Sequence, residues 1–186
     1  MKVPDPLWVV EIEPHWWREA KDEVNLREGK ETFQYKETIF ANGHAQGIVA
    51  ERAFARWTGV MTWPDDFNRR PTGGWQCVLA ERTVKVAGAG RIAEGISVKV
   101  PHKSKTPRKT YADIYVGFRV LERKIELHGW CLGSDMRARP IYQATWKTGT
   151  YKNDYQLMQW SALNRDLDLL RTLLALDPLP SQGALF

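Results

Sequence analysis

Basic side chains are concentrated in one part of this 186-residue chain, and their most direct chemistry is anion binding. Residues 81–109 hold eight Lys and Arg against two acids, a net charge of +6, whereas the whole chain carries +5. The rest of the chain is therefore close to neutral. A concentrated positive segment is typical of proteins that bind polyanions, and nucleic acid is the first candidate. A lysine-rich, solvated loop gives the same pattern and stays open as the alternative.

The last five bases of this segment begin near the end of one predicted strand, 96–100, and run up to the next, 112–120. Pro101 and Pro107 bracket the stretch and restrict its backbone. We predict a nucleic-acid-binding loop whose contacts go to phosphates and weaken as salt is added. Its basic members are Lys99, Lys103, Lys105, Arg108 and Lys109.

One carboxylate, Glu51, stands out on the helix predicted over residues 43–58. The apolar face of that helix includes Phe54 and Trp57. At about 100° per residue, Glu51 lies about 60° from Phe54, on the margin of this face. A carboxylate in that position can turn toward a cleft, and the alternative is an ordinary exposed helix glutamate.

The elements that must position these groups follow from apolar periodicity and from glycine and proline. Helices are predicted over 15–28, 43–58 and the end of 155–176. Strands are predicted over 7–13, 75–80, 82–86, 96–100, 112–120 and 124–132, with a hairpin turn at Glu81-Arg82. After the second hairpin strand, regular structure should be interrupted at three glycines, Gly88, Gly90 and Gly95. Residues 133–150 should be irregular. The expected fold is α+β, or α/β, with a central mixed sheet flanked by helices.

The composition is that of an ordinary globular chain, with 43% apolar and 26% charged residues. We predict one domain over 1–176, made of an N-terminal strand and helix (1–41), a core (42–132) and a strand and helix region (133–176). Residues 177–186 should form a flexible tail. No apolar run approaches the roughly 18 residues of a membrane span, and the N-terminus is a poor signal peptide, so a cytoplasmic protein without membrane contact is expected. Cys77 and Cys131 are expected as buried thiols, and His128 as a packed histidine.

The helix GIVAERAFARW, the strand pair GGWQCVLAERTVKV, the strand YADIYVGFRV and the segment IELHGW follow one another in the chain. This succession resembles the phage and bacterial branch of the PD-(D/E)XK nuclease superfamily, over roughly residues 43–132. The resemblance implies a restriction-endonuclease-like core, a DNA substrate and magnesium as the cofactor of an active member. It also implies a phage protein in the bacterial cytoplasm, with a role in DNA metabolism or host takeover.

Two of the site positions that the resemblance implies are kept, and two are not. Glu51 matches the helix glutamate, a metal ligand, and Lys85 matches the lysine that orients the attacking water or stabilises the transition state. The two central acids fall on Gln76 and Thr83, which are neutral and cannot supply the negative charge that a divalent ion requires. We therefore predict a degenerate site in a nuclease-like protein that binds DNA without cutting it.

Two other interpretations stay open. In the first, the chain is an active magnesium-dependent nuclease whose ligands have migrated, to be drawn from Glu51, Glu81, Glu94 and Asp113. Glu81 would then share a strand face with Lys85. In the second, the fold is only the scaffold of a non-enzymatic inhibitor that binds a host protein. Asp113 is expected to be structural in every case.

The C-terminal sequence QGALF resembles the short motif by which bacterial proteins bind the DNA polymerase sliding clamp. Gln182 would hydrogen-bond in a polar pocket, while Leu185 and Phe186 would fill an apolar cleft. Pro178 and Pro180 would hold the tail extended. The alternative is that the last two residues pack back onto the domain.

Overall fold

The computed structural model describes residues 3–28, 43–63, 77–100, 111–145 and 152–177. The α-helices in these ranges are α1 (Pro14–Glu28), α2 (Gly43–Thr58), α3 (Gly133–Arg137) and α4 (Leu167–Leu173). The strands in these ranges are β1 (Trp8–Glu11), β2 (Cys77–Leu79), β3 (Arg82–Ala89), β4 (Gly95–Lys99), β5 (Ile114–Val120), β6 (Lys124–Leu132), β7 (Ile141–Thr145) and β8 (Lys152–Gln159).

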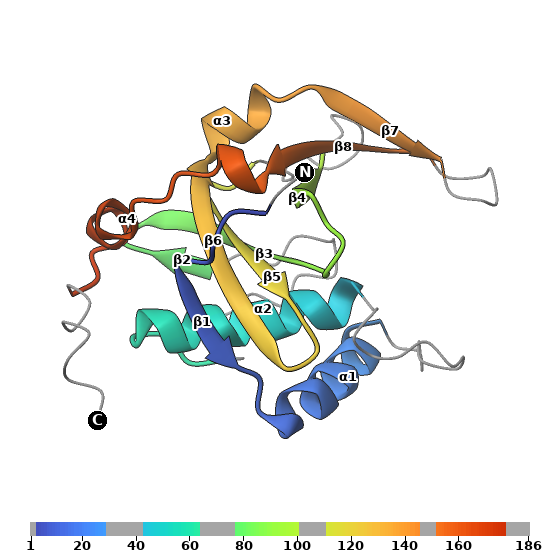
Figure 1. Cartoon of the computed structure of the whole chain (residues 1–186), viewed down its shortest axis with the longest axis vertical. Coiled ribbons are helices and arrows are strands. Elements are labelled where there is room, and N and C mark those ends of the chain that lie inside the picture. The colour runs from blue at the N-terminus through green and yellow to red at the C-terminus, as the bar shows by residue number, and fades with distance from the viewer. Residues whose placement is uncertain (1–2, 29–42, 64–76, 101–110, 146–151, 178–186) are drawn as a thin grey trace.

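Five of these strands form one mixed sheet in the order β1-β6-β5-β3-β2 (Figure 1). β3 runs parallel to β5, and the other neighbours are antiparallel. The three other strands form a second, antiparallel sheet in the order β4-β8-β7. The predicted α+β class with a mixed sheet is therefore confirmed, with the difference that the strands are divided between two sheets.

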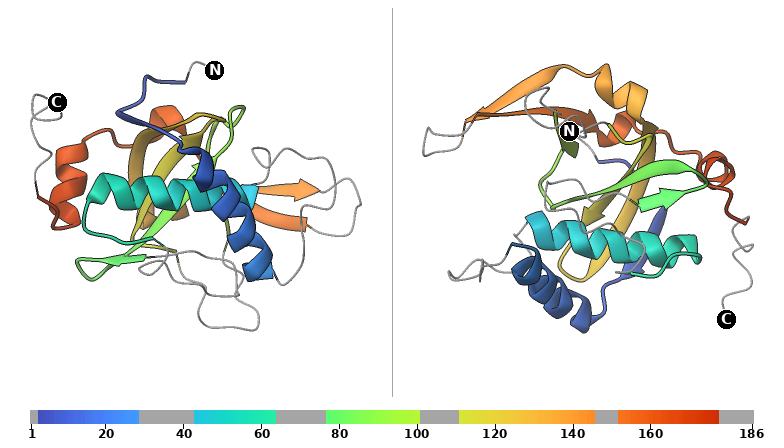
Figure 2. Two further views of the ribbon diagram at one scale, coloured as in Figure 1. Left: turned by 90° about the horizontal axis from the view of Figure 1, so that it is seen from below. Right: turned by 180° about the vertical axis from the view of Figure 1, so that it is seen from behind.

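The two sheets and the helices enclose two apolar cores. α2 packs on β3 and β5, and α1 packs on α2, so both helices lie on the same side of the five-stranded sheet (Figure 2). The second core contains side chains from β3, β5 and β6 together with side chains from β4 and β8. It lies between the two sheets, so each face of β3 and β5 is covered by a different layer.

α2 crosses β3 at Gly88. A Cβ at this position would lie 2.5 Å from the carbonyl oxygen of Gln46 and 3.0 Å from the Cβ of Ala50. The close approach of helix backbone and strand backbone therefore requires glycine here. This contact also places the middle of α2 over the second half of β3.

A bulge in β6 explains the Gly-Trp pair that follows His128. Gly117 pairs with Gly129 and Phe118 pairs with Leu127, so His128 is the extra residue. Gly129 has a φ of 144°, and a Cβ there would lie 2.4 Å from the carbonyl oxygen of Asn164. The bulge thus lets the chain before α4 approach β6 closely.

Several predicted elements agree closely with the structure. The helices predicted over 15–28 and 43–58 are α1 and α2, and the strand predicted over 124–132 is β6. Cys77, Cys131 and His128 are buried, as predicted, and both cysteines are free. Burial raises the pKa of the Cys131 thiol to about 12, which makes this thiol a poor nucleophile.

Other predictions were wrong. Residues 133–150 include α3 and β7 and are not irregular throughout, and β8 occupies the first part of 155–176. β3 continues through Gly88 to Ala89 instead of breaking there. The hairpin turn falls one residue earlier than predicted, at Ala80 and Glu81, which have φ values of 47° and 60°. In the described ranges no helix combines the length and the apolar character that a membrane span requires.

Candidate functional site

The start of β3 and the start of β5 bring Thr83 and Asp113 into direct contact. The amide of Thr83 donates to Asp113 Oδ2 at 2.8 Å, and the Thr83 hydroxyl donates to the same oxygen at 2.7 Å. The Asp113 amide lies 3.0 Å from both the carbonyl and the hydroxyl oxygen of Thr83. The parallel pairing of β3 and β5 begins one residue later, at Val84 and Ile114, so this contact closes the end of the ladder.

The hydrogen bonds from Thr83 fix the charge of Asp113. They hold the pKa of the carboxyl group below its ordinary value, the hydroxyl contributing most, although partial burial opposes the shift. Asp113 is exposed. An ionised carboxylate therefore lies against the residue at which the resemblance implied an acid. These bonds join the start of β3 to the start of β5, a contact that residue spacing alone does not predict.

Lys85 lies on the same face of β3 as Thr83. Its neighbours Val84 and Val86 belong to the core under α2, so the alternation of a strand directs Lys85 to the opposite face. Lys85 pairs with Tyr115, which belongs to the core between the two sheets. The lysine is half-buried there, at the end of the sheet where the Thr83–Asp113 contact lies.

A second lysine, Lys99, lies near Lys85. Burial lowers the pKa of Lys85 below its ordinary value of 10.5, and the positive charge of Lys99 lowers it further. Lys99 is the last residue of β4 and is exposed. The two strands thus bring two ammonium groups to one end of the molecule, where an anion would relieve their repulsion.

Tyr111 and Gln156 close this end of the space between the sheets. The Tyr111 hydroxyl donates to the Gln156 side-chain oxygen, and the Gln156 amide donates to the carbonyls of Arg137 and Arg139 at 3.0 and 2.7 Å. The Arg137 guanidinium lies 5.1 Å from the centre of the Tyr111 ring. Residue patterns do not reveal this group, because Gln156 lies in a stretch whose pattern does not predict a strand.

Glu51 is not part of this arrangement. It is 1% exposed, so the alternative of an exposed helix glutamate is wrong. It follows Ala50, which contacts β3 at Gly88, about 10 Å along the strand from Lys85. The helix that carries it covers the face of β3 opposite to Lys85. The structure therefore separates the glutamate and the lysine that the resemblance would bring together.

The two other acids considered as migrated ligands are also separate. Glu81 lies in the exposed turn between β2 and β3 and not on the strand, so it does not share the strand face of Lys85. Glu94 lies before β4, past the other end of β3, where its carbonyl accepts a hydrogen bond from the Trp160 amide at 3.0 Å. Of the four candidate acids, Asp113 is the one shown to hydrogen-bond Thr83.

Several predicted site residues lie outside the described residues. These are Gln76, the loop bases Lys103, Lys105, Arg108 and Lys109, and the tail residues Gln182, Leu185 and Phe186. Among the positions that the structure describes, no three His, Cys, Asp or Glu side chains converge on a metal site. Magnesium prefers several oxygen ligands, whereas of the four candidate acids the one shown to contact Thr83 on β3 is Asp113. The described donor set does not fit a magnesium centre.

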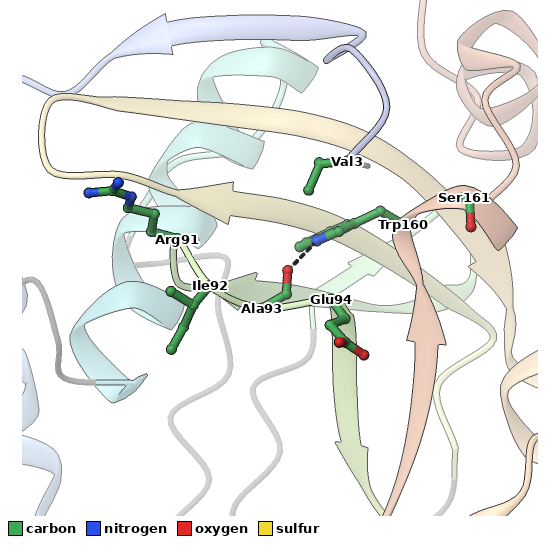
Figure 3. Close-up of a pocket in the computed structure, with 7 residues that line it drawn as sticks. All are labelled: Val3, Arg91, Ile92, Ala93, Glu94, Trp160 and Ser161. Atoms are coloured by element: carbon green, nitrogen blue, oxygen red, sulfur yellow. Dashed lines mark hydrogen bonds between the residues drawn. The ribbon is translucent and has the colours of Figure 1, made fainter. Parts of the chain in front are cut away.

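A cavity of about 230 Å³ lies at the opposite end of β3, around the turn into β4 (Figure 3). Trp160 forms one wall, and its indole nitrogen donates to the Ala93 carbonyl at 2.7 Å. The other lining residues are Val3, Arg91, Ile92, Glu94 and Ser161. Arg91 and Glu94 are both exposed and oppose each other in charge, so this cavity offers no concentrated site for an anion or a cation.

A buried charged group lies on β6 near this cavity. Glu126 accepts from Lys124 at 2.8 Å, from Arg119 at 3.4 Å and from His128 Nε2 at 3.2 Å. Burial alone would raise the pKa of Glu126, but these partners lower it overall. His128 is fully buried and its ring centre lies 5.0 Å from that of Trp160. Because each charge has a partner, we assign this group to the stability of the fold.

No family model, curated protein or solved structure was found to match this chain, so the site must be interpreted from its own geometry.

Proposed function

We propose that this protein binds DNA through the phosphate backbone at the end of the molecule where Lys85, Lys99 and the Thr83–Asp113 contact lie. The observation that carries the proposal is that two lysines come to this end of the molecule: Lys85, half-buried on the face of β3 that points toward the second sheet, and Lys99, the exposed last residue of β4, whose charge lowers the pKa of Lys85. A phosphate placed between them would compensate both charges. The basic sequence 101–110 follows β4 directly in the chain and adds positive charge in the same neighbourhood of the sequence.

We also propose that the protein has a nuclease-like fold but does not cleave DNA. A helix, a hairpin and a mixed sheet follow one another in the order that the resemblance implies, which supports a restriction-endonuclease-like core. Against cleavage, Thr83 is neutral, Asp113 is already engaged by Thr83, and Glu51 lies over the other face of β3. Metal-assisted hydrolysis needs ligands that hold the ion at the scissile phosphate.

A binding assay with a charge-matched control tests the proposal. Fluorescence anisotropy with a labelled DNA duplex should show binding at low salt that weakens as salt is added. Lys85→Met should weaken binding about tenfold or more, since hydrogen bonds to charged groups contribute about 1.5–3 kcal/mol each. Arg123→Gln removes one positive charge from the exposed turn at the other end of β5 and should have little effect. Equal effects of the two variants would contradict a local site.

The C-terminal motif supports a second partner. We propose that Gln182, Leu185 and Phe186 bind a bacterial sliding clamp, which would bring a DNA-binding protein to replicating DNA. The support is the sequence alone: a polar anchor and two apolar anchors that follow two prolines. Isothermal titration with a purified clamp tests it, and the absence of heat at high concentration would contradict it.

A further inference from the structure

One face of the three-stranded sheet carries an aligned row of a lysine and two tyrosines. Lys99 of β4 pairs with Tyr155 of β8, and Tyr155 pairs with Tyr142 of β7. Residues directly opposite each other in antiparallel strands project from the same face. The three side chains therefore form one line across the sheet.

This face points away from the core between the sheets. Ile96 and Val98 of β4 and Met158 of β8 belong to that core, so the alternate residues project outward. Tyr142 is 46% exposed and Tyr155 is half-buried. β7 and β8 extend beyond the body of the molecule as a two-stranded arm, next to β4 at one end only (Figures 1 and 2). Within the described ranges β7 pairs with β8 and with no other strand.

The two tyrosine rings form a continuous aromatic surface. Their centres lie 5.7 Å apart and their planes are inclined by 30°. Such a tilted cross-strand pair stabilises a hairpin, but the exposed side of Tyr142 remains available to another planar group.

The charge of the face favours a polyanion over a protein partner. Along the described part of β4, β8 and β7, the outward positions include Ser97, Lys99, Leu157 and Gln159 beside the two tyrosines, and no acid. Asp154 pairs with Gln143 and so projects from the other face. An aromatic surface with a cation at its edge and no carboxylate is complementary to bases joined by phosphates.

We propose that this face binds single-stranded DNA, with bases stacking on Tyr142 and Tyr155 and a phosphate meeting Lys99. The inference rests on the proposed DNA-binding function and names its substrate class. Bases in a duplex are stacked on one another and cannot lie on a protein ring, whereas bases of a single strand can be splayed onto it. Lys99 belongs both to this row and to the lysine pair with Lys85, so a strand could pass from one to the other.

Anisotropy titrations with a labelled oligothymidylate and with a labelled duplex test the proposal. Tyr142→Ala and Tyr155→Ala should each weaken single-strand binding roughly 5- to 160-fold, the range found when a stacking aromatic is removed. Tyr142→Phe keeps the ring and should bind within about twofold of wild type, because stacking does not need the hydroxyl. Ile141→Ala is the control: Ile141 projects from the opposite face of β7 and is 57% exposed. Its replacement should leave the affinities for the single strand and for the duplex unchanged.

Photocross-linking separates stacking from a loss of structure. An oligonucleotide that contains 5-iodouracil, irradiated with the wild-type protein, should attach to the peptides that carry Tyr142 or Tyr155. If the alanine variants keep wild-type affinity for the single strand, or if the attachment maps elsewhere, this inference is wrong and duplex binding through Lys85 still stands. If the wild-type protein binds neither DNA at low salt, the proposed function itself fails, and this inference fails with it.

Discussion

Asp113 accepts two hydrogen bonds from Thr83 on a single oxygen, one from the backbone amide at 2.8 Å and one from the hydroxyl at 2.7 Å. The two residues are 30 positions apart in the chain and meet because β3 and β5 are parallel neighbours. An acid that directly precedes β5 thus lies against the β3 residue at which the resemblance implies an acid. The carboxylate stays exposed, and its lowered pKa comes mainly from the two bonds of Thr83 and, to a smaller extent, from the charge of Arg82.

Removing the Thr83 hydroxyl should raise the pKa of Asp113. In Thr83→Val the stronger of the two bonds is lost while the amide bond remains, so the pKa should move toward the ordinary value of 3.8. A carboxyl with a lowered pKa contributes stability above its unfolded pKa, and this contribution is lost as the pH falls through the folded value. Because Asp113 is exposed, the change in stability should stay below about 1 kcal/mol.

A carbon-detected NMR titration of the Asp113 carboxyl measures this shift directly. Ser97→Ala, which alters an exposed hydroxyl on β4, is the control and should leave the titration unchanged. An unchanged pKa in Thr83→Val would show that the hydroxyl does not stabilise the carboxylate.

Lys85→Met should stabilise the folded protein at neutral pH. Burial and Lys99 lower the pKa of Lys85, so the folded state holds its proton less tightly than the unfolded chain does. The wild-type protein should therefore gain stability as the pH rises from the pKa of Lys85 in the folded state toward 10.5, its ordinary value. The variant, which lacks this ammonium group, should not show the gain. Urea unfolding at neutral and at alkaline pH measures the difference. A variant that is less stable than wild type at both pH values would contradict this account.

His128 should make the protein sensitive to acid. Burial lowers the pKa of His128 below 6.5, and the positive charges of Arg119 and Arg165 lower it further. The hydrogen bond and the charge of Glu126 raise the pKa, but they offset the lowering only in part. Below pH 6.5 the unfolded chain takes up a proton that the folded chain does not, so stability should fall with pH until the folded pKa is reached. In His128→Gln this fall should be reduced. His15→Gln, on the partly exposed histidine of α1, is the matched control.

Thermal unfolding between about pH 5.5 and pH 7.5, one unit either side of an ordinary histidine pKa, measures this dependence. The same pH slope in wild type and in His128→Gln would assign the acid sensitivity to other groups.

Gly129→Ala should destabilise the fold strongly. The added Cβ would lie 2.4 Å from the Asn164 carbonyl oxygen, and the φ of 144° is unfavourable for alanine. A loss of about 2 kcal/mol or more in the free energy of unfolding is expected. Gly47→Ala is the contrasting substitution, since nothing lies within 4 Å of a Cβ there and the residue is in α2. It should raise stability by up to about 1 kcal/mol. Urea titrations compare the two, and equal effects would contradict the close approach at Gly129.

Removal of Gln182–Phe186 should abolish binding to a sliding clamp without lowering the melting temperature, if the motif acts as a free peptide. Differential scanning fluorimetry and a clamp titration on the truncated chain decide this. A large drop in melting temperature would instead show that Leu185 and Phe186 pack on the domain.

Elements with a strong local signal could be predicted from the sequence. The apolar stripe of 43–58 and the β-branched and aromatic residues of 112–132 identify α2, β5 and β6, since burial on one face repeats at a fixed spacing. β8 lacked this signal because it buries a glutamine, Gln156, whose amide is satisfied by two backbone carbonyls. In a sequence pattern, a polar residue of the core cannot be distinguished from a surface residue until its hydrogen-bond partners are known.

The candidate site could be predicted only in part. Lys85 and the neutral Thr83 were identified correctly as strand neighbours on one face, because alternation along a strand is a local property. The contact of Thr83 with Asp113 and the proximity of Lys85 to Lys99 depend on which strands pair, and this is set by the whole fold. The position of Glu51 also depends on the crossing of α2 and β3 at Gly88, which periodicity does not reveal.

Binding and cleavage of DNA measured on the same samples test the central claim most directly. End-labelled duplex and single-stranded DNA are incubated with the wild-type protein and magnesium or manganese, then analysed by native and by denaturing electrophoresis. The account predicts retarded DNA on the native gel, intact DNA on the denaturing gel, and reduced retardation with Lys85→Met. Metal-dependent cleavage that disappears in Lys85→Met would contradict it, as would DNA that is neither retarded nor cut at low salt.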